Sequence, residues 1–155
     1  MKLGMRFAAV TLYKNFVSDA SVLGGLPFYA VLMAYLGIAD SALAFRMLMA
    51  LGILFSIVYS VKFLYFKRRP DVHKNHFPTL LERLENSSFP SVHAARATLL
   101  YMAFFFGKDY IMSAVGLLLL ASVAASRVAL KRHYLSDVGA GILIGVAIGY
   151  WAFIG

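Results

Sequence analysis

Residues 138–155 read VGAGILIGVAIGYWAFIG, a stretch of 18 residues without a charged side chain. A membrane-spanning helix needs about 20 such residues, with a range of about 17–25. Other charge-free stretches occupy 20–39, 47–61, 97–107 and 110–126, with 20, 15, 11 and 17 residues. Apolar runs separated by short charged segments therefore repeat along the chain, and this pattern predicts a membrane protein.

The composition supports the same class. Of 155 residues, 61% are hydrophobic and 14% are charged, and the mean hydropathy is +0.77. Soluble domains average about 45–50% apolar and about 25% charged residues. This excludes an ordinary soluble domain, a disordered chain and a basic nucleic-acid-binding protein. The net charge is +8, and the basic residues that produce it lie between the apolar runs. This position favours membrane lipids and phosphates as partners. The absence of cysteine excludes disulfides, thiolate metal sites and cysteine nucleophiles.

We predict an all-α, polytopic membrane helix bundle that forms a single domain over 1–155. Five membrane helices are expected near 20–39, 43–66, 91–107, 110–127 and 135–154. Residues 1–18 are apolar but carry three basic residues, so they are interpreted as an interfacial segment or a degenerate sixth helix. Residues 67–89 form a polar loop on the side of the candidate site, with a short helix expected at 79–84.

Three glycines at four-residue spacing lie in the last apolar stretch: Gly141, Gly145 and Gly149. Such a stripe lets another helix backbone approach closely. One hypothesis is a homodimer face, and the other is tight packing inside one bundle. The second is favoured about threefold, because helix packing within a chain is the commoner use of small residues.

If the predicted helices alternate in direction, the second and fourth end where the third and fifth begin. Ionisable residues at membrane helix ends are functional candidates. The candidates at this face are Lys62, Arg69, Ser91, His93, Arg127, His133 and Asp137. Each alone has an ordinary explanation, such as a lysine reaching the head groups or a solvated surface pair. Their order and common face together favour a site.

These residue types suit phosphoryl chemistry. Lysine and arginine neutralise phosphate oxygens, and Ser91 and the amides of a helix N-terminus are further donors. His133 and Asp137 are four residues apart, which predicts a shared helix face. The carboxylate can then hold one imidazole nitrogen while the other attacks phosphorus, and His93 can protonate the leaving oxygen. His73 and His76 have no third ligand nearby, so no metal is expected.

Three blocks of sequence carry a family resemblance: KFLYFKRRP at 62–70, SSFPSVHA at 87–94 and SRVALKRHYLSD at 126–137. They resemble the three motifs of the type 2 phosphatidic acid phosphatase superfamily, K-x6-RP, PSGH and SR-x5-H-x3-D. The resemblance implies that His133 forms a phosphohistidine, that Asp137 orients it and that His93 is the general acid. It also implies that the phosphate is held by Lys62, Arg69, Ser91, Arg127 and the backbone N–H of Val92, without a metal or other cofactor.

Val92 stands where the family usually has glycine. Valine keeps the backbone N–H, but its side chain can crowd the phosphate or forbid a positive φ. The sequence therefore leaves open whether this position lowers activity or reshapes the loop.

The function expected from the resemblance is that of a multi-pass cell-membrane lipid phosphatase. The first-choice substrate is a polyprenyl diphosphate, followed by phosphatidate or phosphatidylglycerol phosphate. The alternatives are a lipid-to-lipid phosphotransferase and a catalytically silent lipid-binding membrane protein.

The charge distribution bears on which membrane face carries the site. Eleven basic residues remain when those in or beside the site (Lys62, Arg69, Arg96 and Arg127) are set aside. Nine lie on the predicted site face: Lys2, Arg6, Lys14, Lys67, Arg68, Lys74, Arg83, Lys131 and Arg132. Two lie opposite: Arg46 and Lys108. This count predicts a cytoplasmic site, whereas the resemblance implies an extracytoplasmic one. A phosphate-seeking surface is basic for its own reasons, so both remain open.

Overall fold

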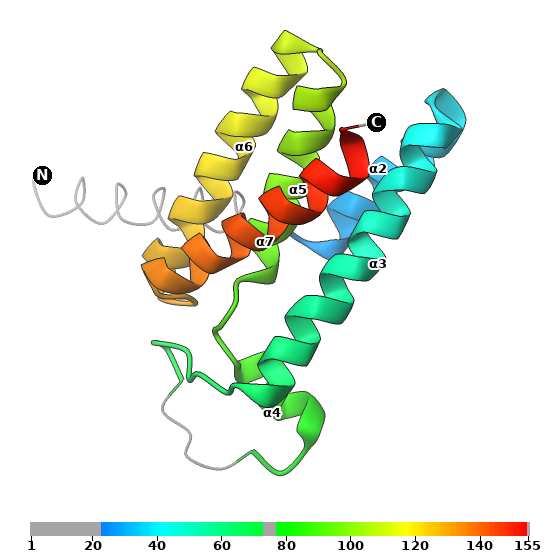
Figure 1. Cartoon of the computed structure of the whole chain (residues 1–155). Helices are drawn as coiled ribbons and strands as arrows, with labels where there is room; N and C mark the ends of the chain where they lie inside the picture. Colours follow the sequence, from blue (N-terminus) through cyan, green and yellow to red (C-terminus); the bar gives the residue numbers. More distant parts are fainter. Residues whose placement is uncertain (1–22, 73–76, 155) are drawn as a thin grey trace, which may run out of the picture.

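A computed structural model describes residues 23–72 and 77–154, and it is all-α over these residues, as predicted. Six helices make up the described part: α2 (Leu26–Ala39), α3 (Ser41–Leu64), α4 (Leu80–Asn86), α5 (Val92–Phe106), α6 (Tyr110–Ala129) and α7 (Leu135–Phe153) (Figure 1). The predicted interfacial segment 1–18 and the loop histidines His73 and His76 lie outside the described residues.

Local chemistry sets the helix boundaries. The side chains of Asp40 and Asp109 each accept a backbone N–H in the first turn of the helix that follows, so α3 and α6 begin directly after very short connections. The first described helix begins at Leu26, later than the predicted start near residue 20. Residues 23–25 form a turn, and Pro27 occupies the first turn of α2, where its missing N–H costs no helical hydrogen bond.

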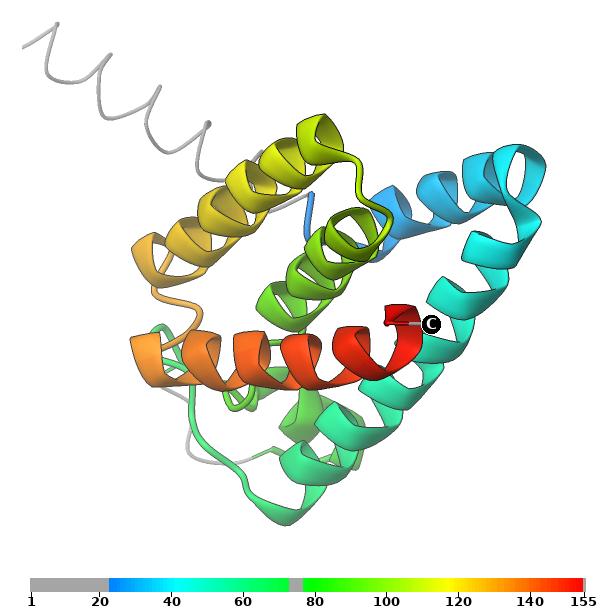
Figure 2. The same cartoon turned by 45° about the horizontal axis from the view of Figure 1, so that its top comes forward.

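Helix α5 is the centre of the bundle, and Figure 2 shows α6 and α7 on either side of it. Every side chain from 94 to 100 is buried, although this was the shortest of the predicted membrane helices. The main hydrophobic core joins α5 to α3, with Leu99 packed among Met47, Leu54 and Val58. Three of these seven buried residues of α5 are alanines, whose small side chains let neighbouring helices come close.

The glycine stripe of α7 lies against α5. A Cβ atom at Gly145 would lie 2.6 Å from the Ala95 carbonyl oxygen and 2.7 Å from Thr98 Cβ, and one at Gly149 would lie 2.6 Å from Met102 Cβ. Gly141 is likewise buried against the start of α5. The hypothesis of packing inside one bundle is therefore confirmed. The homodimer hypothesis is wrong, because the surface it needs is already occupied by α5.

Three helices are long and apolar enough to cross a membrane: α3, α6 and α7, with 24, 20 and 19 residues. Helices α2 and α5 are shorter apolar helices of 14 and 15 residues. Large apolar side chains cover the outside of the bundle; Leu118 and Leu143, for example, are 69% and 71% exposed. Such an apolar exterior is suited to lipid and not to water.

The α5–α7 contact makes a testable prediction. Replacing Gly145 with alanine should lower the free energy of unfolding by about 1–3 kcal/mol, the usual cost of overpacking. Gly139→Ala is the matched control on the same helix, because a Cβ there meets nothing within 4 Å. Unfolding in detergent, followed by circular dichroism, measures both variants. Equal stability of the two would contradict the close approach.

Candidate active site

The long loop folds back onto the bundle through backbone contacts. Arg68 and Ser87 form a β-bridge, and the Ser88 N–H donates to the Lys67 carbonyl oxygen at 2.6 Å. On the other side, Arg132 pairs with Asp71 at 3.1 Å, which joins the loop to the α6–α7 connection. The loop is thus fixed beside the helix ends that the topology predicts to meet.

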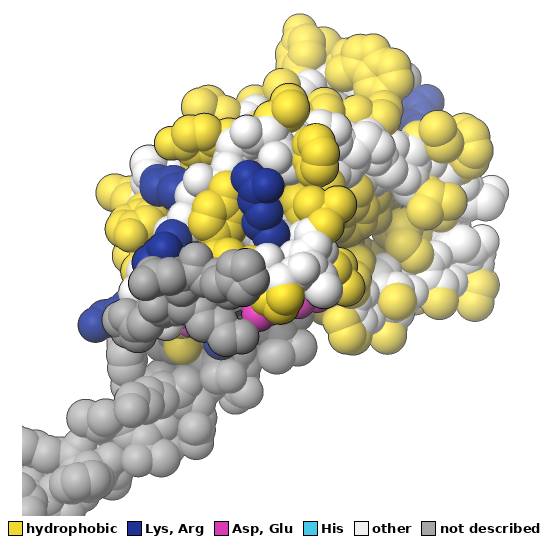
Figure 3. Space-filling view, turned by 90° about the horizontal axis from the view of Figure 1, so that it is seen from below, with side chains coloured by type: hydrophobic (Ala, Val, Ile, Leu, Met, Phe, Trp, Pro, Cys, Tyr) yellow, Lys and Arg dark blue, Asp and Glu magenta, His cyan; other side chains and the backbone are white. Residues whose placement is uncertain are grey.

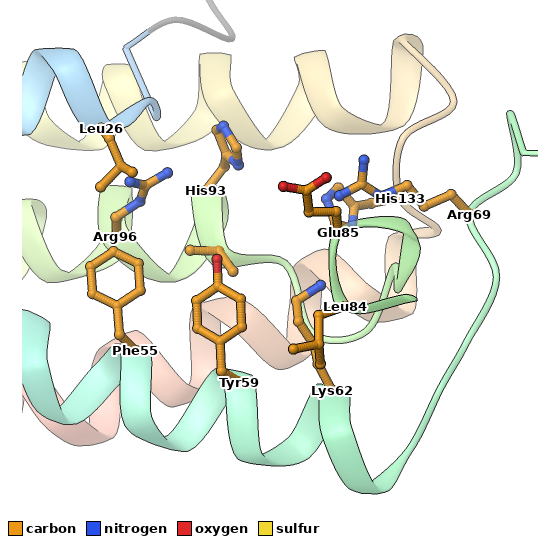
Figure 4. Close-up of a pocket in the computed structure, with 11 residues that line it drawn as sticks. Leu26, Phe55, Tyr59, Lys62, Arg69, Leu84, Glu85, His93, Arg96 and His133 are labelled. Atoms are coloured by element: carbon orange, nitrogen blue, oxygen red, sulfur yellow. The ribbon is translucent and has the colours of Figure 1, made fainter. Parts of the chain in front are cut away.

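One cavity of about 370 Å³ lies at this meeting point (Figure 4). Five of the predicted site residues line it, and they come from all three sequence blocks: Lys62, Arg69, Val92, His93 and His133. The predicted meeting of the helix ends is therefore confirmed. The other lining residues come from α2, α3, α4 and α5: Leu26, Phe55, Tyr59, Leu84, Glu85 and Arg96.

The remaining predicted residues lie next to the cavity lining. Ser91 caps α5, and its own N–H donates to the Asp137 carbonyl oxygen at 2.9 Å. The Arg127 carbonyl oxygen accepts the His133 N–H at 3.1 Å, so this arginine is directly beside the histidine. Both Ser91 and Arg127 are buried. Neither is among the residues that line the cavity.

His133 is 4% exposed, and its Nδ1 lies 2.6 Å from the Ser88 carbonyl oxygen. A carbonyl can only accept, so this contact assigns the proton to Nδ1 and leaves the Nε2 lone pair free. Burial, together with the positive charges of Arg127, Arg69 and Lys62, lowers the pKa of His133 to about 3, although the Ser88 contact opposes this shift. The imidazole is therefore neutral at physiological pH, the form that a nucleophile requires.

Asp137 does not share a helix face with His133, and that prediction is wrong. Helix α7 begins at Leu135, so His133 precedes it. The Asp137 carboxylate instead caps the helix by accepting the Tyr134 N–H at 2.9 Å, and it pairs with Lys67 Nζ at 2.5 Å. The position that the sequence assigned to Asp137 at the imidazole is occupied by the Ser88 carbonyl.

Sequence reasoning missed two groups that hold the histidine. Lys67 connects Ser88 with Asp137, because its carbonyl oxygen accepts the Ser88 N–H and its ammonium pairs with the Asp137 carboxylate. Lys67 lies at a variable position of the first block, and Ser88 lies in the second block before the PSVH motif at 90–93, so neither gives a sequence signal. Glu85, an acid in a cationic cavity, was also missed. Arg96 was placed in or beside the site by the sequence, and its position three residues after His93 is the signal that both side chains lie on one helix face.

The site is strongly cationic. The buried ammonium of Lys62 donates a hydrogen bond to the Ser87 carbonyl oxygen. Burial and the nearby charge of Arg132 lower the pKa of Arg69. In the view from below in Figure 3, most of the visible lysine and arginine side chains gather towards one side among hydrophobic ones. Such a set in an apolar setting is chemically fitted to bind an anion with several oxygen atoms.

Comparisons with known proteins agree with this arrangement. The family model described as PAP2 superfamily matches residues 41–155. The fold is similar to that of LpxE from Aquifex aeolicus, with a TM-score of 0.78 and 22% identity over 91% of this chain and 85% of that chain. It is also similar to a transmembrane PAP2 type phosphatidylglycerolphosphate phosphatase from Bacillus subtilis, with a TM-score of 0.74 and 20% identity over 91% and 75%. No curated protein matches the sequence.

The environment of His133 predicts how it titrates. An ordinary histidine becomes charged below about pH 6.5, whereas His133 should stay neutral down to about pH 3. Because the unfolded chain takes up this proton more readily, acidification below about pH 6.5 should also favour unfolding. Histidine-selective NMR, assigned by the signal lost in His133→Gln, measures the midpoint. A midpoint near 6.5 would contradict the buried, cation-flanked site.

Proposed function

Because the chain belongs to the PAP2 superfamily, we propose that it is a membrane lipid phosphatase acting through a phosphohistidine at His133. The observation that carries this proposal is the single cavity lined by Lys62, Arg69, His93 and His133. These residues come from three separate sequence blocks and supply two imidazoles and two cations. The substrate is a lipid phosphate or diphosphate.

The reaction runs in two steps. The free Nε2 of His133 attacks phosphorus, the bond from phosphorus to the leaving oxygen breaks, and His93 gives that oxygen a proton. Water then attacks the phosphohistidine, gives its proton back to His93 and releases phosphate from His133. Lys62, Arg69 and Arg127 neutralise the charge that builds on the phosphoryl oxygens.

The contacts of His133 support this assignment of its nitrogens. Nδ1 is held by the Ser88 carbonyl, and Ser88 is itself fixed to Lys67. The imidazole therefore meets phosphorus in one orientation, with little entropy left to lose. Asp137 acts on this arrangement through Lys67 and the α7 cap, so we propose that it is a positioning residue.

A lipid substrate is favoured by the apolar part of the cavity wall. Leu26 of α2 and Phe55 of α3 line the same space as the histidines. A head group bound at His133 would thus have an apolar surface beside it for the start of its chain. We infer that α2 and α5 also lie within the membrane, making five helices. α5 can be short because α3, α6 and α7 enclose it.

His133→Ala should abolish phosphate release from every lipid phosphate tested, because it removes the nitrogen proposed to form the covalent intermediate. His93→Ala should reduce kcat about 10²–10⁴-fold, the range of general acid catalysis. A phosphate-release screen in detergent over prenyl diphosphates, phosphatidate and phosphatidylglycerol phosphate measures this. His76→Ala, outside all three sequence blocks, is the control variant. Turnover by His133→Ala would remove the proposed nucleophile.

A silent lipid-binding protein is the second candidate, and Val92 is the feature that favours it. Val92 begins α5 with helical backbone, however, and among the described residues positive φ occurs only at Lys108 and Lys131. The position therefore does not require glycine. The Val92 side chain still lines the cavity.

Val92→Gly should change kcat/KM less than about tenfold, since the backbone is already helical and only side-chain crowding is relieved. The same screen measures this variant beside the wild type. A large gain would show that Val92 obstructs the phosphate. Release by neither protein, from any lipid phosphate, would support the silent candidate.

A further inference from the structure

Arg96 is a buried cation that the three sequence blocks do not include. It is 3% exposed and lines the cavity. Its Nε and Nη1 are buried without a hydrogen-bond partner among the described residues. Its guanidinium lies 5.4 Å from the ring centre of Tyr29 and 5.6 Å from that of Phe55. Aromatic faces attract the charge but cannot accept these N–H groups as oxygen does.

A second buried polar group beside Arg96 also lacks a hydrogen-bond partner among the described residues. Tyr29 is buried on α2, and its hydroxyl likewise has no hydrogen-bond partner in the described part of the chain. A buried guanidinium and a buried hydroxyl without oxygen partners destabilise a fold, so their retention calls for a ligand. A group with several acceptor oxygens and negative charge satisfies both. Phosphate has this chemistry.

The position of Arg96 in the cavity indicates which phosphate group of a substrate it would contact. Arg96 follows His93 by three residues on α5, so both side chains lie on one face, with Arg96 one turn further from the N-terminus of the helix. Figure 4 shows His93 between Arg96 and His133 along the cavity. In the proposed reaction His93 protonates the leaving oxygen. The leaving group therefore extends from His93 towards Arg96.

We propose that Arg96 binds the second phosphate of a lipid diphosphate, the one that stays with the lipid. This inference rests on the proposed phosphatase function and names its substrate class. His133 attacks the terminal phosphorus, the bond to the bridging oxygen breaks, and that oxygen leaves on the lipid monophosphate with the proton from His93. Arg96 neutralises the charge of this leaving phosphate. Leu26 and Phe55, which line the same cavity, then meet the first carbons of the chain.

The test compares two substrates that differ by one phosphate, farnesyl diphosphate and farnesyl monophosphate. Arg96→Gln should lower kcat/KM for the diphosphate by about 10- to 100-fold, the range for a lost charged hydrogen bond. It should leave kcat/KM for the monophosphate within about twofold, because that substrate has no group at Arg96. Arg96→Lys keeps the charge without the planar fork and should fall between, again for the diphosphate alone. Arg46→Gln is the control for loss of a charge. Arg46 is exposed and lies near the N-terminus of α3, whereas Lys62 of the site lies near the C-terminus of that helix.

The outcomes separate this inference from the function on which it rests. An equal loss on both substrates, or no loss on the diphosphate, would overturn the role of Arg96 and leave the phosphatase intact. If the wild type hydrolyses neither farnesyl substrate but releases phosphate from another lipid phosphate of the screen, the inference alone is overturned. Release from no lipid phosphate would overturn both. If Arg96→Gln does not fold, as judged by its thermal unfolding in detergent, the substrate ratio of Arg96→Lys decides. An unchanged ratio in that variant would also count against the inference.

Discussion

The close approach of α5 and α7 is the constraint on which the site depends. Gly141, Gly145 and Gly149 remove the side chains that would hold these helices apart. At their N-terminal ends the Ser91 N–H donates to the Asp137 carbonyl. This contact fixes the second and third sequence blocks relative to each other. Because His93 belongs to one block and His133 to the other, a displacement of these helices would change the distance between the two imidazoles.

Much of this arrangement could be predicted from the sequence. Charge-free runs gave the helices, and alternating directions brought Lys62, His93 and His133 to one end. The exact partners could not be predicted, because they depend on turn geometry. His133 lies one residue before the α7 N-cap, and this small offset exchanges the Asp137 carboxylate for the Ser88 carbonyl. The start of α2 was missed because turn residues 23–25 lie inside an uncharged run.

The glycine stripe shows a related limit. Small residues at four-residue spacing indicate that the backbone of a second helix comes close. They do not indicate whether that helix belongs to the same chain. The alanine-rich face of α5 is the complementary surface, with Ala94 and Ala95 against Gly141 and Gly145. The two features lie about 50 residues apart in the chain. Their pairing follows from topology, because α5 and α7 flank a single intervening helix.

The cations of the site work against the stability of the bundle. Lys62, Arg96 and Arg127 are buried. Arg69 lies close enough to His133 for its charge to lower the pKa of that histidine. Bringing like charges together away from water costs free energy that apolar residues of the same size would not. A bound phosphate group offsets this repulsion at the place where charge develops in the reaction. The same burial that disfavours the cations also keeps His133 neutral, so the destabilising arrangement is the one that makes the imidazole a nucleophile.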